Sequence, residues 1–425
     1  MHFGIISPPV PGHLNPFGAL GRELQQRGHR VTLLHMEDVR AKALAENLEF
    51  LPLGSLDHPP GSLPESLRQL GRLSGFPALR FTIRAVQRTT EMFCRDAPPV
   101  IRSAGIDALL ADQTEPAGCT LAEHLKIPFL TICNALNLNE EPDVPPPFTP
   151  WRFQKSTWAR ARNNMGYRVS QIVTSPIAGV VARYRERWGL PGHRHPSQSF
   201  SKLAQISQLP PGFDYPRSRL PSHFYYTGPL RSSHTPDIAF PWSRLNGKPL
   251  IYASLGTLQN GRNRVFTIFA EACATLDVQL VLAGVDMQSI GPLPGDPIAV
   301  GYAPQLAVLK KAALTLTHAG LNTVLDSLSC SVPIVAVPIN YEQPAIAERI
   351  RWSGSGKTIR FSTLTAEKLN RTIKEVLSRS YYRESAVGLA RNIEDAGGVV
   401  RAADIVEEAM ERNTLIPKIE QAPRC

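Results

Sequence analysis

Two stretches of this chain alternate short apolar runs with helical patterns, and this alternation restricts the fold more than any other feature. The first begins with the run FGIISP at 3–8, passes through the proline-rich loop PPVPGHLNP and becomes helical in pattern over 17–28. The run HRVTLLH at 29–35 follows, so the order strand, loop, helix, strand predicts a βαβ unit with parallel strands. Runs at 106–112 and 127–133 extend the series, with a short helix expected over 117–125.

A second series of the same kind occupies the C-terminal half. Its strand-like runs are 249–256, 278–284, 297–304, 313–320 and 333–339, and its helices are predicted near 263–276, at 305–312 and at 322–328. We therefore expect an α/β protein with two Rossmann-like, doubly wound domains facing each other across a cleft. The predicted boundaries are 1–232, a linker at 233–245, 246–400, and a closing helical segment at 401–425 that packs back on the first domain. Ligands of such sheets bind beyond the C-terminal strand ends, so the cleft is the expected active site.

Length and cysteine usage narrow the class of protein. The 425 residues are enough for two or three domains with sizeable cores, and no apolar run reaches 18 residues. The N-terminus lacks the basic region of a secretory signal. The six cysteines are scattered without a CxxC pair. We expect a cytoplasmic protein with reduced thiols, without a disulfide framework or zinc site.

The formal net charge of +10 is concentrated between residues 151 and 195. The basic residues of that segment, against Glu186 alone, are Arg152, Lys155, Arg160, Arg162, Arg168, Arg183, Arg185, Arg187 and Arg194. Interleaved with them are the aromatic residues Trp151, Phe153, Trp158, Tyr167, Tyr184 and Trp188. This mixture suits contact with anionic lipid headgroups, although a solvated basic face with aromatic residues in the core is the plainer interpretation. Nucleic acid is not an expected partner, because no binding module accompanies the segment.

Two kinds of chemistry find little support. The string SGSGKT at 353–358 partly matches the phosphate-binding P-loop motif, but Arg351 occupies the position where the motif requires its first glycine. The pattern before it is helical, so a helix-ending glycine pair is the better interpretation. The chain also contains neither HExxH nor DxD. Without a carboxylate pair to hold a divalent ion, backbone amides and polar side chains must stabilise any leaving-group charge.

One histidine and one aspartate share an edge of the first predicted sheet. His13 lies in the loop after the first strand, and Asp112 ends the strand at 106–112. Imidazole has a near-neutral intrinsic pKa and can take a proton from a hydroxyl when a partner fixes its tautomer. His13 is therefore a candidate general base and Asp112 its orienting acid, while a structural or surface histidine is the alternative.

The second predicted sheet contains a polar strand-to-helix turn, THAGLNT at 317–323. Free backbone N–H groups and the positive end of a helix favour an anion at such a turn. From Gly301 the chain continues GYAPQLAVLKKAALTLTHAGLNTVLDSLSCSVPIVAVPINYEQP. This stretch resembles the nucleotide-sugar signature of the UDP-glycosyltransferase family, whose fold is GT-B. PGHLNP and GHRVTLL near the N-terminus are also similar to that family.

The resemblance implies a role for each matching residue. Tyr302 would stack on uracil, where the family most often has Trp, Ala303 would offer its backbone to the base, and Gln305 would contact the nucleoside. Residues expected near the diphosphate are Ser254, Gly256, Thr257, His318, Gly320, Asn322 and Thr323. Asp326 replaces the usual Glu that binds the ribose, and Glu342 with Gln343 matches the acidic–Gln pair that holds the sugar. His13 matches the general base and Asp112 its orienting acid.

The implied activity is inverting transfer of a sugar, with glucose preferred, from a UDP-sugar without a metal or other cofactor. HAGLNTVLDSLS, VPIVAVPI and EQPAIAERI look similar to bacterial carotenoid (zeaxanthin) glucosyltransferases, which implies a lipophilic hydroxylated acceptor. A soluble phenolic, macrolide or sterol acceptor stays open, as do a UDP-sugar epimerase or hydrolase and a non-catalytic binding protein. A lipophilic acceptor would also account for the basic–aromatic segment at 151–195, which would place the cytoplasmic protein peripherally on the inner membrane face. The oligomeric state is left open.

Overall fold

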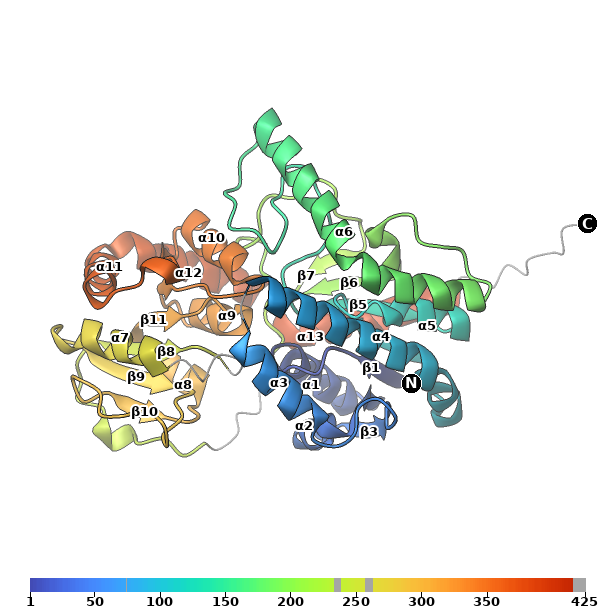
Figure 1. Ribbon diagram of the computed structural model, residues 1–425, viewed down its shortest axis with the longest axis horizontal. Helices are drawn as coiled ribbons and strands as arrows, with labels where there is room; N and C mark the ends of the chain where they lie inside the picture. Colours follow the sequence, from blue (N-terminus) through green and yellow to red (C-terminus); the bar gives the residue numbers. More distant parts are fainter. Residues whose placement is uncertain (74, 233–237, 257–262, 416–425) are drawn as a thin grey trace, which may run out of the picture.

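The computed structural model describes residues 1–73, 75–232, 238–256 and 263–415, and it contains two parallel sheets flanked by helices (Figure 1). The first sheet has the order β3-β2-β1-β4-β5-β6-β7 and the second β10-β9-β8-β11-β12-β13. The first consists of β1 (His2–Ile6), β2 (Arg30–His35), β3 (Glu49–Pro52), β4 (Ala108–Asp112), β5 (Phe129–Cys133), β6 (Gln205–Ser207) and β7 (Phe224–Tyr226). The second consists of β8 (Leu250–Ser254), β9 (Gln279–Ala283), β10 (Ile298–Val300), β11 (Ala312–Thr317), β12 (Ile334–Ala336) and β13 (Gly356–Thr358).

The helices lie between and around these strands. Those of the N-terminal half are α1 (Pro11–Gln26), α2 (Arg40–Ala45), α3 (Ser62–Arg72), α4 (Gly75–Ala104), α5 (Ala117–Leu125) and α6 (Thr157–Arg187). Those of the C-terminal half are α7 (Asn263–Ala274), α8 (Gln305–Leu309), α9 (Leu321–Ser329), α10 (Gln343–Trp352), α11 (Ala366–Ser378), α12 (Ser380–Asp395) and α13 (Gly398–Leu415). In the part of the chain that these elements describe, no helix is both long and apolar enough to span a bilayer.

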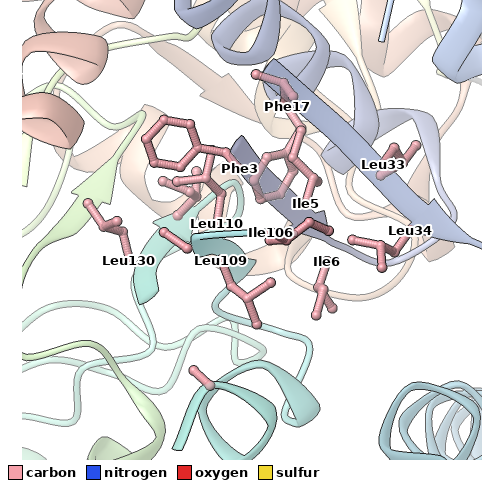
Figure 2. Packing of buried hydrophobic residues seen from close by; sticks show 14 of the residues in the cluster. Phe3, Ile5, Ile6, Phe17, Leu33, Leu34, Ile106, Leu109, Leu110 and Leu130 are labelled. Atoms are coloured by element: carbon pink, nitrogen blue, oxygen red, sulfur yellow. The ribbon is translucent and has the colours of Figure 1, made fainter. Parts of the chain in front are cut away.

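The first sheet is buried because its strands carry apolar side chains toward both faces, as parallel sheets require. Phe3, Ile5 and Ile6 on β1 are fully buried; Phe17 of α1 lies on the side of Phe3 and Ile5, whereas Ile6 points to the opposite face of the sheet (Figure 2). Burying each such side chain contributes about 1.5–3 kcal/mol. This packing holds β1 and β4 in register, with Ile6 paired to Ala111, and so fixes where the chain after each strand emerges.

Both sheets reverse their strand order at their centre. The first turns between β1 and β4, and the second between β8 and β11. In open α/β sheets a ligand site forms outside the carboxyl ends of the strands at such a reversal. The two predicted histidines follow β1 and β11, one at each reversal. The doubly wound prediction is confirmed.

Some predicted boundaries are wrong. His13 is not in a loop, because α1 begins at Pro11 and places it in the first helical turn. Proline at the first helical position suits a helix start, since its missing N–H would be unpaired there anyway. The helix predicted over 305–312 ends at Leu309, because Ala312 already belongs to β11. In SGSGKT, Gly354 follows α10 with φ of 72°, as expected for a helix end, whereas Gly356 lies in β13.

Side chains join the two halves of the molecule at several points. The carboxylate of Asp214, after β6, accepts from Arg349 of α10 at 3.0 Å and from Arg217 at 3.0 Å, and all three side chains are buried. Burial alone would raise the pKa of Asp214, but the two guanidinium groups outweigh it and hold that pKa well below its usual value. Removing one partner of such a buried pair typically costs about 3–5 kcal/mol.

The C-terminal helix α13 returns to the first half of the chain and packs against α1. Arg27 donates to Asp404 and Glu407 at 2.7 Å each, and Ile405 and Val406 join the core around β1. The predicted linker at 233–245 lies partly outside the described residues.

Candidate active site

The first group of predicted residues meets at the end of β1 and β4. His13 Nδ1 lies 2.8 Å from Asp112 Oδ2. Asp112 also accepts from the backbone N–H and the hydroxyl of Thr114, at 2.8 and 2.6 Å, and from Asn134 Nδ2 at 2.9 Å. With Nδ1–H donating to the carboxylate, Nε2 carries the free lone pair that a general base needs.

The ionisation of this pair follows from its burial and charge. Desolvation alone would lower the pKa of His13, but Asp112 by charge and hydrogen bond, with Glu342 by charge, raises it. Burial would raise the pKa of Asp112, and His13 and Thr114 outweigh it and lower that pKa. The Asp112 side chain is fully buried, whereas 19% of the His13 side chain remains exposed. The imidazole can therefore still be reached by a reactant.

Glu342 and Gln343, the predicted acidic–Gln pair, hydrogen-bond to two different backbone segments. Glu342 Oε2 accepts from the backbone N–H of Leu136 at 2.9 Å, so the loop after β5 is joined to the start of α10. Burial raises the pKa of Glu342, and the Leu136 N–H and His13 offset part of that rise. Gln343 Oε1 accepts from the N–H groups of Ile339 and Asn340, both at 2.9 Å, which shapes the turn ahead of α10.

His318 lies in the second group, between two glycines. A Cβ on Gly256 would stand 2.8 Å from the imidazole Cε1, and one on Gly320 would stand 2.6 Å from it. The φ of Gly256 is 68°, a conformation that side-chain-bearing residues rarely adopt. Burial lowers the pKa of His318 to about 4, opposed only by a hydrogen bond to the backbone of Ser254. The ring is therefore neutral at physiological pH.

The turn after His318 leads directly into α9. Gly320 is the N-cap of α9 and provides no capping side chain, so in this described turn the first backbone N–H groups of the helix are not satisfied by a cap. Asn322 Nδ2 donates across the interface to the carbonyl of Gly12 at 2.9 Å. That carbonyl is free for it because Pro16, four residues later in α1, has no N–H to donate. This bond places the α9 turn beside the residue that precedes His13.

A third group surrounds Asp326. Gln305 Nε2 donates to Asp326 Oδ2 at 2.6 Å, and the Tyr252 hydroxyl donates to Gln305 Oε1 at 3.0 Å. Arg231 Nε donates to Asp326 Oδ1 at 2.6 Å, and its Nη2 lies 3.2 Å from Asn322 Oδ1. Arg231 was not among the predicted residues. Arg231 is a basic residue shortly after β7, at the end of the N-terminal half. This position is the only signal in the sequence that could have identified it.

The remaining predicted residues are less closely joined. The exposed fraction of Tyr302 is 66%, so its ring is accessible for stacking, whereas Ala303 is buried. Thr323 makes a contact of 3.5 Å to Gln305. Ser254 ends β8, and its hydroxyl accepts from the N–H of Gly256 at 3.2 Å. Thr257 lies outside the described residues.

Metal-ligating side chains gather elsewhere. Within the described ranges, the group with suitable spacing is Cys119, Glu123 and His193. Arg185 already donates to Glu123 at 2.6 Å, and burial raises the pKa of the Cys119 thiol to about 12. None of the predicted donor-binding residues belongs to this group.

Comparison with known proteins identifies the family. A family model described as "UDP-glucoronosyl and UDP-glucosyl transferase" matches residues 203–397, and one for the glycosyltransferase family 28 N-terminal domain matches residues 11–133. A zeaxanthin glucosyltransferase of Pantoea ananas is 36% identical over 418 residues, covering 96% of each chain. This chain belongs to the UDP-glycosyltransferase family. It is accordingly a glycosyltransferase, and the predicted family resemblance is confirmed.

Further relatives agree on function class and fold. The zeaxanthin glucosyltransferase of Pseudescherichia vulneris is 34% identical, covering 96% of this glycosyltransferase and 98% of the relative. The crystal structure of the calicheamicin glycosyltransferase superposes with a TM-score of 0.74 at 23% identity, covering 97% of this chain and 98% of that one. The crystal structure of the kitacinnamycin glycosyltransferase gives 0.73 at 24% identity, over 96% and 98%. The GT-B prediction is confirmed.

In this glycosyltransferase, His13 and the turn that begins α9 lie at one interface. His13 has a carboxylate neighbour, whereas His318 has glycine neighbours and neutral character. The Asn322–Gly12 bond joins the two turns. Chemically, the first group can accept a proton while the second can donate hydrogen bonds to a departing anion.

Proposed function

We propose that this glycosyltransferase moves glucose from UDP-glucose, with inversion, to a hydroxyl of a lipophilic acceptor such as a carotenoid, with His13 as the general base. The observation that carries the proposal is the 2.8 Å contact between His13 and Asp112, tied through Gly12 and Asn322 to the α9 turn. The carotenoid acceptor is supported by the two zeaxanthin glucosyltransferases at 36% and 34% identity.

The reaction is an in-line displacement. The acceptor hydroxyl loses its proton to His13 Nε2 as its oxygen bonds to the anomeric carbon. The bond from that carbon to the UDP oxygen breaks, and both electrons leave with UDP. Attack from the face opposite UDP converts an α-linked donor into a β-glycoside. General-base assistance is typically worth about 10²–10⁴-fold in rate.

Departure of UDP needs no metal in this proposal. The N–H groups at the start of α9 would donate to the diphosphate, and the neutral imidazole of His318 would lie against it, with Ser254 and Thr323 nearby. Asp326 would exchange its bond to Gln305 or Arg231 for the ribose hydroxyls, Tyr302 would stack on uracil, and Glu342 with Gln343 would hold the sugar. Losing one such oxyanion donor typically costs about 10²–10³-fold.

The proposal is tested by incubating the enzyme with UDP-glucose and zeaxanthin, with chelator present, and identifying the product. A β-glucoside, detected by mass spectrometry and by the anomeric proton coupling in NMR, is the expected result. A panel containing a phenol, a macrolide and a sterol separates the alternative acceptors. An α-glucoside would contradict inversion, and activity only with added divalent metal would contradict metal independence.

A lipophilic acceptor dissolves in bilayers, so the proposal extends to membrane contact through 151–195 and a position on the inner membrane face.

A further inference from the structure

The segment 151–195 divides into two structurally different parts. The side chains of its C-terminal part make contacts within the protein. Arg183 pairs with Glu91 of α4 at 2.9 Å, and Arg185 pairs with Glu123 of α5 at 2.6 Å. Trp188 stacks on His124 with ring centroids 4.0 Å apart. The N-terminal half of α6 instead rises clear of both sheets at the top of Figure 1.

An apolar stripe runs along this projecting half. Trp158, Met165, Val169 and Ile172 are exposed to 68, 58, 50 and 72%. Their spacing of seven, four and three residues places them on one face of the helix, over a length of about 21 Å. Four large apolar side chains in one row on a solvent-facing helix are unusual, because isolated exposed residues are the normal case.

The preceding loop packs against the projecting half of α6 and holds it in place. The face of α6 next to the stripe is buried against the preceding loop: Asn163 donates to the carbonyl of Pro142 at 2.9 Å, and the Tyr167 hydroxyl donates to that of Val144 at 3.0 Å. A Cβ on Gly166 would meet the Trp151 ring at 2.7 Å. The loop therefore packs against one side of α6, and the stripe on the adjacent side stays exposed.

The segment that carries the stripe is basic, whereas the preceding loop supplies Asp143 and Glu140, which accept from Arg160 and Gln171 of α6. Between residues 151 and 175 there are five basic residues and no acidic one. Arg160 pairs with Asp143 at 2.6 Å, and Arg162 lies over the rings of Trp151 and Trp158, at 4.9 and 5.3 Å. The other three are Arg152, Lys155 and Arg168, which are exposed and form no ion pair with any residue described in the structure. An apolar row between unpaired cations complements a bilayer whose surface is anionic.

We propose that the stripe of Trp158, Met165, Val169 and Ile172, with Arg152, Lys155 and Arg168 around it, docks the enzyme on an anionic lipid bilayer. The apolar side chains enter the headgroup–acyl boundary and the cations meet lipid phosphates. This inference rests on the proposed function for its purpose, delivery of a bilayer-dissolved acceptor, but the surface itself involves none of the residues around His13 or His318.

Flotation of the full chain with vesicles tests the docking. Vesicles of phosphatidylcholine mixed with phosphatidylglycerol should carry the protein, and binding should weaken with added salt. The variant Trp158→Ser/Met165→Ser/Ile172→Ser should bind at least about tenfold more weakly. The variant Arg152→Gln/Lys155→Gln/Arg168→Gln should lose about fivefold per cation at low salt, or roughly a hundredfold in total.

The matched control is Leu44→Ser/Met287→Ser/Val400→Ser, which removes three apolar side chains exposed to 59, 56 and 52% on other faces. It should float like the unaltered protein. Equal losses in the control and the stripe variant would overturn the proposal, as would equal flotation with pure phosphatidylcholine. A dimer of the unaltered chain that the stripe variant abolishes in sedimentation, without vesicle binding, would show that a second copy covers the stripe.

UDP binding and glucose transfer to a water-soluble alcohol, measured without vesicles, separate the two proposals. Both should be unchanged in the stripe variant. Failure of the unaltered protein to float while it still glucosylates zeaxanthin in detergent would overturn docking alone. Flotation by a protein without UDP affinity would overturn the proposed function and leave docking standing.

Discussion

Two strand-to-helix turns meet at the centre of this molecule, and each holds a histidine in a different environment. After β1, His13 contacts a buried carboxylate at 2.8 Å, and its pKa is raised. After β11, His318 has glycines on either side, and burial lowers its pKa to about 4. The same fold position thus yields a group suited to take a proton and a group suited to stay neutral, because the neighbours and not the imidazole set the chemistry.

Removing the first imidazole should have the largest effect. His13→Ala leaves the acceptor hydroxyl without a base, so we expect kcat to fall at least about a hundredfold. UDP affinity, measured by calorimetry, should persist because the α9 turn is unaltered. Near-normal turnover by this variant would remove His13 from the mechanism.

Asp112 is the carboxylate that distinguishes the first turn from the second. In the unaltered enzyme, kcat/KM should fall as pH drops through the raised pKa of His13, above 6.5, because only neutral imidazole can accept a proton. Asp112→Asn removes the charge that raises this pKa. We expect the acid limb to move to lower pH and kcat to drop by roughly 10–100-fold, since the tautomer is held less firmly.

A full pH profile of this variant beside the unaltered enzyme gives the measurement. Glu115→Gln is a suitable control, because Glu115 is a buried acid three residues further on, whose pKa burial raises to about 8. Its neutral replacement should leave the acid limb in place. An unmoved limb in Asp112→Asn would mean that another group titrates.

The pairing of His13 with Asp112 could be predicted because parallel strands bring their carboxyl ends to one edge of a sheet. No knowledge of side-chain packing was needed for that step. The Arg231–Asp326 contact could not be predicted in this way, since the partners lie 95 residues apart in different halves of the chain. Only the relative placement of the two sheets brings them together.

Helix α6 could not be predicted from the sequence pattern for a different reason. In the N-terminal half of the helix the buried face carries Ala159, Asn163 and Gly166, which are small or polar, beside Tyr167, while Trp158, Met165, Val169 and Ile172 are exposed. Hydrophobic periodicity assumes the reverse arrangement. The early start of α1 was hidden similarly, because a proline-rich string reads as a loop although proline suits the first helical turn.

The glycines of the second turn provide a smaller but sharper test. Gly320 has φ of −67°, so alanine adds no backbone strain, but its Cβ would stand 2.6 Å from the His318 ring. Displacing the ring should raise KM for UDP-glucose about tenfold, with a smaller change in kcat. Gly388→Ala, where a Cβ meets nothing within 4 Å, is the control. Unaltered KM in Gly320→Ala would show that the ring position is irrelevant to the donor.

The smallest effect should appear in stability, where the two histidines differ in sign. A group whose folded-state pKa is lowered destabilises the folded state as pH falls below its unfolded value, because only the unfolded chain takes up the proton. With pKa values of about 4 folded and 6.5 unfolded, His318 should cost about 1 kcal/mol of unfolding free energy between pH 6.5 and pH 5.5. His13, with a raised pKa, contributes stability that is present below pH 6.5 and lost as pH rises through its folded value.

Urea unfolding of His318→Gln and of the unaltered protein at pH 6.5 and pH 5.5 measures the contribution of His318 to the free energy of unfolding. On acidification the variant should lose about 1 kcal/mol less than the unaltered protein. Equal losses would mean that the imidazole of His318 is protonated in the folded state, and the contrast between the two turns would then disappear.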